Sequence, residues 1–312
     1  MKTTILNRII VIILFLFFYS CESKSTDNND SITDETPKIE QLVSVATGDD
    51  LAAIPSSANY IKEQSLKGQN SSPYGYVIRY PEGFGTDGKA YPILIYLHGS
   101  GSRGNSDVTA EDINKVDTGG GMGSIKNNLW NPNVVVPIIA PQCPKGTNWQ
   151  PQKVKEFIEF VIDASGNAIN ENRIYLAGFS MGGMGVWDYL DANGYENSLV
   201  ASVVTMAGTR AENGKNIEAL KLMPFWVFHG LRDQTVNANR SINLVEKFRA
   251  LSPEQQHQKL TLFTQNDTQN HTRGNHRIDY GVFFRELWEA NQAGDFFNED
   301  IMNWMLQYRR ND

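Results

Sequence analysis

The hydrophobic positions of this chain fall into short runs that are separated by glycine, proline and asparagine. Several runs are apolar at almost every position, which is typical of strands covered on both faces of a sheet. The predicted strands are 76–80, 93–97, 134–139, 174–178, 200–206, 225–228 and 260–263.

Longer segments between these runs carry apolar residues at helical spacing. The predicted helices are 152–164, 181–193 and 242–251. Strands that alternate with helices predict an α/β fold, with a mostly parallel central sheet and helices on both of its faces. The glycine-rich stretch 119–123 lacks the lysine of a phosphate-binding loop, so we expect a flexible loop there.

The first residues predict export. Residues 1–20 combine basic residues with an apolar run over 9–19, which is typical of a signal peptide and too short for a membrane-spanning helix of about 20 residues. The segment ending at Cys21 resembles a bacterial lipobox, which predicts lipidation of Cys21 and anchoring to a bacterial membrane on the periplasmic or cell-surface side. Polar residues over 21–47 indicate a flexible tether, and 48–312 forms the expected catalytic domain.

Composition and charge narrow the possible partners. Hydrophobic residues make up 40% of the 312 residues, which is enough for one packed core. The net charge of −7 opposes nucleic-acid binding. With Cys21 lipidated, Cys143 has no disulfide partner, and we interpret it as a packed loop residue.

The sequence from Gly178 to Gly182 places Ser180 between two glycines, directly after a predicted strand and before a predicted helix. A sharp strand-to-helix turn needs small residues on either side of the raised serine, so Ser180 is the predicted nucleophile. The backbone N–H of Met181, at the start of the helix, is then a predicted oxyanion donor.

A second loop follows strand 93–97 and reads His-Gly-Ser-Gly over 98–101. Its small residues allow the backbone to approach a substrate carbonyl, so an N–H of Ser100 or Gly101 is the predicted second oxyanion donor. We expect His98 to order this loop by hydrogen bonding.

The acid and the base follow Ser180 in the chain. Asp233 lies just past strand 225–228 and is the predicted acid, whereas His229 before it is interpreted as a loop residue. The base is His271 or His276, and the sequence favours His271 because it lies closer to the end of strand 260–263.

Taken together, the motifs over 98–104, 140–144, 173–183 and 229–233 resemble the bacterial predicted-peptidase and esterase group of α/β-hydrolases, which is related to polyhydroxybutyrate depolymerases and feruloyl esterases. The resemblance runs from about residue 74 to the end of the chain. It implies the α/β-hydrolase fold and a triad of Ser180, Asp233 and a C-terminal histidine, with no metal or organic cofactor.

These observations predict an exported serine hydrolase that cleaves carbohydrate-linked or polymeric carboxylic esters through an acyl-enzyme on Ser180. Two alternatives stay open: a serine peptidase with the same triad, and a surface binding protein that keeps the fold without the chemistry. The expected partners are a small-molecule or polysaccharide ester and, through the lipid anchor alone, a membrane.

Overall fold

The structure is a computed structural model. It describes residues 43–45, 49–107, 109–118, 120–127, 132–210, 217–251, 253, 257–264, 276–283, 292–295 and 297–311. The chain divides into two units, and all described residues belong to the second, Leu42–Asp312. The predicted signal peptide and Cys21 therefore lie outside the described residues.

The described part of the chain is built around one nine-stranded sheet with the order β10-β9-β8-β7-β6-β4-β5-β3-β2. Neighbours from β9 to β5 pair in parallel, and the edge strands pair antiparallel. The parallel strands are β4 (Tyr91–Leu97), β5 (Ile138–Pro141), β6 (Ile169–Phe179), β7 (Ser202–Met206), β8 (Phe225–Gly230) and β9 (Gln258–Phe263). The remaining strands are β2 (Tyr60–Ser65), β3 (Tyr76–Pro81) and β10 (Gln292–Gly294).

The central strands are buried on both faces, as their continuous apolar sequences predict. All seven residues of β4 are buried. Ile93, Ile95 and Leu97 belong to the core on one face of the sheet, whereas Leu94 and Tyr96 belong to the core on the other. This alternation is the period of two expected of a strand, so each face of β4 needs its own layer of helices.

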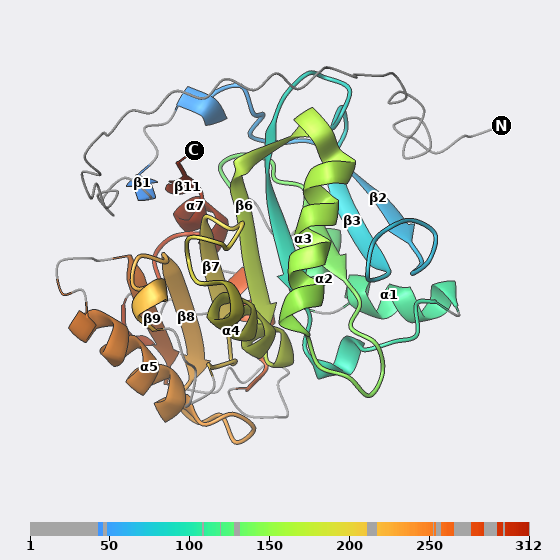
Figure 1. Ribbon diagram of the computed structural model, residues 1–312. Coiled ribbons are helices and arrows are strands. Elements are labelled where there is room, and N and C mark those ends of the chain that lie inside the picture. Colours follow the sequence, from blue (N-terminus) through green and yellow to red (C-terminus); the bar gives the residue numbers. More distant parts are fainter. Residues whose placement is uncertain are drawn as a thin grey trace, which may run out of the picture. The chain divides into compact units, whose positions relative to one another are not determined.

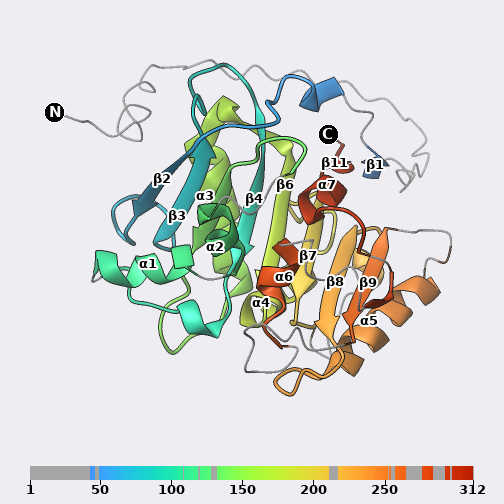
Figure 2. The ribbon, with the colours of Figure 1, turned by 180° about the vertical axis from the view of Figure 1, so that it is seen from behind.

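Two layers of helices supply that cover (Figures 1 and 2). Apolar side chains of α3 (Pro151–Ser165), α4 (Met181–Asn193) and α5 (Ala238–Leu251) pack into the first core. Those of α1 (Ala110–Thr118), α2 (Gly120–Lys126), α6 (Asp279–Phe283) and α7 (Ile301–Met305) pack into the second. The predicted mostly parallel sheet with helices on both faces is confirmed.

The glycine-rich stretch differs from the prediction. Gly119 lies outside the described residues, but α2 begins at Gly120, so the expected flexible loop over 119–123 is wrong for the rest of the stretch. Met122 and Ile125 lie three positions apart on this helix and are both buried. Burial of this apolar pair offsets the low helix propensity of the glycines.

The described residues include a short strand ahead of residue 48, the predicted start of the catalytic domain. Strand β1 (Val43–Val45) lies within the expected tether and pairs antiparallel with β11 (Tyr308–Arg310) near the C-terminus. Asp50 then forms an ion pair with the fully buried Arg173 at the start of β6. Within the described residues, no helix has the length and apolarity needed to cross a membrane.

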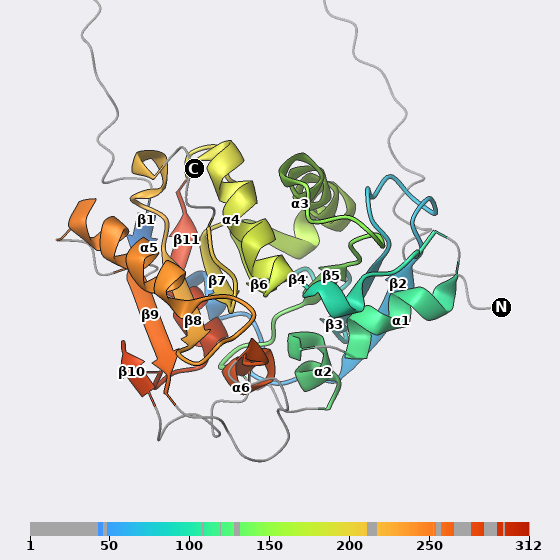
Figure 3. The same cartoon turned by 90° about the horizontal axis from the view of Figure 1, so that it is seen from below.

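The parallel strands place their carboxyl ends at one edge of the sheet. Figure 3 looks onto the end of the molecule at which β6 runs into α4, with α3, α4 and α5 on one side of the sheet and α2 and α6 on the other. Crevices at this edge are where open α/β sheets bind ligands.

Candidate active site

Ser180 occupies the turn between β6 and α4, as predicted. Its backbone has φ 53° and ψ −116°, a left-handed conformation that is rare for a residue with a side chain. The N–H of Ser180 donates to the carbonyl of Met206 at 2.8 Å, which fixes the strained turn against β7. Strain of this kind clusters at functional sites, where the surrounding structure maintains it.

The glycines around Ser180 are required by close backbone contacts. A Cβ on Gly182 would overlap the carbonyl oxygen of Leu97 at the end of β4, and a Cβ on Gly178 would overlap the carbonyl oxygen of Gly182. The turn therefore holds the amino end of α4 directly against the end of β4.

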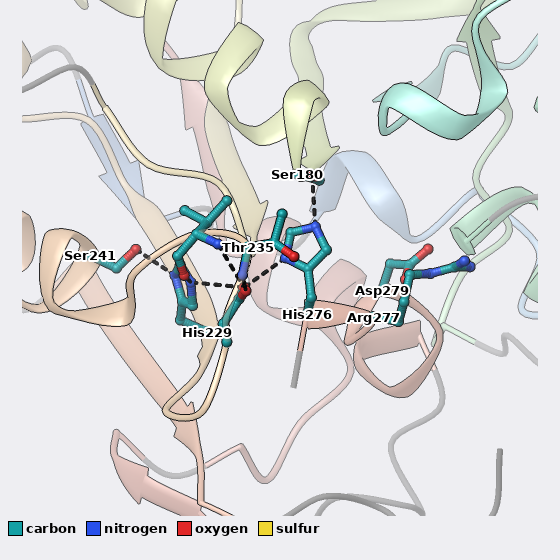
Figure 4. Close-up of polar contacts among 9 residues, drawn as sticks. Ser180, His229, Thr235, Ser241, His276, Arg277 and Asp279 are labelled. Atoms are coloured by element: carbon teal, nitrogen blue, oxygen red, sulfur yellow. Dashed lines mark hydrogen bonds and ion pairs between the residues drawn. The ribbon is translucent and has the colours of Figure 1, made fainter. Parts of the chain in front are cut away.

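A continuous hydrogen-bonded series connects Ser180, His276 and Asp233 (Figure 4). Ser180 Oγ lies 3.0 Å from His276 Nε2, and His276 Nδ1 lies 2.7 Å from Asp233 Oδ2. An ionised carboxylate can only accept, so Nδ1 carries the proton and Nε2 accepts from the serine hydroxyl. This tautomer is the one that can remove the proton of Ser180.

The geometry places His276 in the position of the base. His271 lies outside the described residues. His276 precedes α6, and its ring packs against Phe179, the last residue of β6, with 5.4 Å between ring centroids. The sequence favoured His271 for its distance from the strand end, whereas the structure brings the ring of His276, just ahead of α6, to Ser180.

The carboxylate of Asp233 is completely buried and held by several donors. Its Oδ1 accepts from the N–H groups of Thr235 at 2.7 Å and Val236 at 2.9 Å. Burial alone would raise the pKa of Asp233, but hydrogen bonds from His229, His276 and these two N–H groups together hold the pKa well below its usual range. Asp233 is therefore ionised at neutral pH.

His98 orders the loop after β4, as the sequence predicts. Its Nδ1 lies 2.7 Å from the carbonyl of Gly99, and its Nε2 accepts from the N–H of Cys143 at 3.0 Å. Trp149 donates from Nε1 to the carbonyl of His98 at 3.1 Å. Burial lowers the pKa of His98 to about 4, so the ring is neutral at pH 7 and stays in this bonded form.

The sequence did not identify the residues that support this loop. Cys143 was correctly interpreted as a buried loop residue, but its backbone N–H also fixes the ring of His98. Gln142 adds a second support, because its Nε2 donates to the carbonyl of Ser102 at 3.1 Å. Loop polar residues after β5 carried no signal that distinguished them from ordinary turn residues.

The predicted oxyanion residues come from two segments that the structure brings together. Met181 is the first residue of α4, and the first N–H groups of a helix have no intrahelical acceptor. Ser100 and Gly101 begin the short 3-10 turn that follows β4. The approach of Gly182 to Leu97 places the start of α4 beside this turn. The start of α4 and the loop after β4, which carry the predicted backbone donors, are therefore neighbours.

A cavity of about 250 Å³ lies beside these groups. It extends from the loop after β4 to Arg277 and Asp279, which follow the candidate base, and Figure 4 shows these two side chains on the far side of His276 from His229. Its lining residues are Tyr96, His98, Gly99, Gly101, Ser102, Thr118, Phe179, Arg277 and Asp279. Among the described residues, no group of three or more His, Cys, Asp or Glu is arranged to hold a metal ion.

Comparison with solved structures gives the fold. A thermostable esterase superposes with a TM-score of 0.55 at 21% identity, over 80% of this chain and 63% of that protein, so the chain spans less than two thirds of its length. A mutant of the feruloyl esterase module from Clostridium thermocellum, complexed with sinapinate, gives a TM-score of 0.45 at 15% identity, over 80% of this chain and 94% of that one. No curated protein sequence matches the chain.

Comparison with protein families agrees with the topology. The family model described as the alpha/beta hydrolase fold matches residues 140–312, which is more than half of the chain. The matched region contains the strand-turn-helix around Ser180 and continues through Asp233 and His276. The chain belongs to the α/β-hydrolase family.

Proposed function

We propose that this protein is a serine hydrolase that cleaves carboxylic esters through an acyl-enzyme on Ser180. The observation that carries the proposal is the series of hydrogen bonds from Ser180 through His276 to the buried, ionised Asp233. A structural serine needs neither a strained turn nor an imidazole held in one tautomer.

The first half of the reaction forms the acyl-enzyme. Ser180 Oγ attacks the ester carbonyl carbon while its proton passes to His276 Nε2, and the carbonyl oxygen becomes an oxyanion. The N–H of Met181 and an N–H of Ser100 or Gly101 stabilise this negative charge. The C–O bond to the leaving alcohol then breaks, and His276 returns the proton to the alcohol oxygen.

The second half releases the acid. His276 takes a proton from water, the hydroxide attacks the acyl carbonyl, and collapse of the second tetrahedral intermediate returns the proton to Ser180 Oγ. Asp233 stays ionised throughout, because its role is to hold the ring and to stabilise the imidazolium. Its depressed pKa is consistent with that role.

Hydrolysis of short-chain p-nitrophenyl esters tests the proposal. Ser180→Ala and His276→Ala should each lower kcat by about 10⁴- to 10⁶-fold. His271→Ala serves as the matched control and should keep most of the turnover. Equal hydrolysis by wild type and Ser180→Ala would refute the proposal, and loss of activity in His271→Ala alone would transfer the base to His271.

We also propose that the enzyme is exported, lipidated on Cys21, and active on carbohydrate-linked or polymeric esters outside the cytoplasm. The sequence over residues 1–21 supports export, and an exported enzyme meets polymers that cannot enter the cell. Incorporation of labelled palmitate into wild type but not Cys21→Ser tests the anchor. Release of acid from feruloylated and acetylated polysaccharides, compared with cleavage of peptides, tests the substrate class.

A further inference from the structure

His229 is a buried imidazole that the proposed reaction does not use. It lies near the end of β8, four residues before Asp233, and its side chain is completely buried. Its Nδ1 lies 2.8 Å from Ser241 Oγ in α5, and its Nε2 lies 2.9 Å from the carbonyl oxygen of Val236. The same Nε2 lies 3.3 Å from Asp233 Oδ2.

These contacts determine where the proton of His229 lies. The carbonyl of Val236 can only accept, so Nε2 carries the proton, and Nδ1 accepts from the hydroxyl of Ser241. The N–H at Nε2 therefore faces two acceptors, the carbonyl of Val236 and Oδ2 of Asp233. A neutral ring with this tautomer satisfies both of its nitrogens inside the core.

Both carboxylate oxygens of Asp233 therefore have close polar contacts. Oδ1 of Asp233 accepts from Thr235 and Val236, while Oδ2 lies between the rings of His229 and His276 (Figure 4). The contact from His229 comes from the end of β8, and its other ring nitrogen is bonded to Ser241 in α5. The carbonyl of Val236 accepts from the same N–H, so this hydrogen bond connects the loop after Asp233 to β8.

We propose that His229 is a positioning residue, whose N–H at Nε2 holds Oδ2 of Asp233 in the orientation that His276 requires. This inference rests on the proposed function and deepens it. The pKa of Asp233 agrees with this role, because the contact with His229 is the first of the influences that lower the pKa of this carboxyl against the effect of burial. Among the residues that the structure describes, His229 and His276 are the titratable side chains recorded in contact with Asp233.

The test separates the N–H donor from simple packing. His229→Leu fills the space but lacks the donor, whereas His229→Gln keeps an N–H in a similar place. We expect His229→Leu to lower kcat by about 10- to 100-fold, the range found when outer hydrogen-bond partners of a functional group are removed, with KM unchanged. His229→Gln should recover most of this loss. His257→Leu, which removes a half-buried histidine at the start of β9, is the matched control and should keep wild-type kcat.

A second readout does not depend on turnover. Carbon-13 NMR of the Asp233 carboxyl in the Ser180→Ala background should show a pKa that rises toward its ordinary range in His229→Leu and stays low in His229→Gln. If His229→Leu fails to fold, His229→Met provides the same test, because it also fills the space without an N–H donor. We expect the NMR pKa of Asp233 to rise there as well.

The outcomes separate this inference from the proposed function. An inactive wild-type protein would refute ester hydrolysis and leave the NMR test of Asp233 intact. With an active wild type, unchanged kcat in His229→Leu would overturn the positioning role. A loss in His229→Leu that His229→Gln does not restore would also overturn it, because packing alone would then explain the effect.

Discussion

Substitution of Gly182 by alanine tests how the turn at Ser180 creates the site. The added methyl group would overlap the carbonyl oxygen of Leu97, and it would lie 2.5 Å from the carbonyl carbon of Leu97 and 2.9 Å from the carbonyl oxygen of His98. All three are backbone atoms, so no side-chain rotation can relieve the overlap. The amino end of α4 must therefore move away from β4.

The size of the required movement sets the expected loss of activity. Restoring an ordinary van der Waals separation of 3.4 Å or more moves the start of α4 by about 1.5 Å, and a misplacement of about 1 Å can already cost about 10²-fold in rate. In free energy, a 10²-fold loss in kcat/KM corresponds to about 2.7 kcal/mol. Overpacking of a well-packed core also costs about 1–3 kcal/mol of stability. We therefore expect Gly182→Ala to lose both activity and thermal stability.

The assay combines kcat/KM on a p-nitrophenyl ester with thermal unfolding followed by tryptophan fluorescence. Gly101→Ala is the control for stability, because a Cβ at Gly101 meets no atom within 4 Å and its backbone needs no positive φ. Its melting temperature should match that of wild type. If Gly182→Ala kept both wild-type turnover and wild-type stability, the close contact with β4 would not be what holds the oxyanion donors in place.

Two further predictions concern charge and pH. Asp50→Asn should lower the free energy of unfolding by about 3 kcal/mol in urea titrations, because it leaves the buried Arg173 without its counter-charge, whereas Lys89→Gln at an exposed pair should change it by less than about 1 kcal/mol. Arg173 lowers the pKa of Asp50, so the difference in unfolding free energy between wild type and Asp50→Asn should have its full size above pH 3.8 and should shrink as the pH falls below 3.8. A difference in unfolding free energy that did not change with pH would contradict this. The pKa of His98 is lowered from 6.5 to about 4, so the unfolded state binds the proton first and stability should fall as the pH drops from 6.5 to 4. Denaturation of His98→Asn should show a smaller decline over this range, and an equal decline would place its origin elsewhere.

The central strands could be predicted from sequence because burial on both faces leaves a continuous apolar run. Strands β4, β6 and β8 each contain the predicted segment, β7 begins two residues after the start of the predicted 200–206, and α4 has the predicted bounds. The edge strand β2 was missed because four of its six residues are polar or charged and most of them are partly exposed, so it shows neither a continuous run nor a clean alternation.

Strand β5 shows a different limit. The apolar run predicts a strand over 134–139, whereas the strand covers Ile138–Pro141. Val135 and Val136 are buried, but they contribute to two separate hydrophobic clusters from a segment ahead of the strand. The apolar run correctly indicates burial at these positions. A strand is defined by its backbone hydrogen bonds to neighbouring strands, which hydrophobicity does not reveal.

Some residues of the candidate site can be recognised from the local sequence, whereas others are defined only by contacts between distant parts of the chain. Ser180 and Asp233 are recognisable because each sits in a local context, a strand followed by a particular turn, that the sequence displays directly. His276 has no such context. It is defined by contacts with Ser180 and Asp233, from which it is separated by 96 and 43 residues, so a single sequence cannot distinguish it from another loop histidine.

The geometry also explains why the residues around the triad matter as much as its members. Each reacting group lies at or near the end of a different element. Parallel pairing fixes the positions of the strand ends, but it does not fix the loops that follow them. A separate buried contact removes that freedom in each case: the Gly182 contact for Ser180, the packing on Phe179 for His276, and the N–H of His229 for Asp233. Because these contacts are made by a glycine, a phenylalanine and a neutral histidine, none of them takes part in the proposed chemistry. The rate should nevertheless depend on all three, since hydrogen-bond geometry at Ser180 Oγ has little tolerance for displacement.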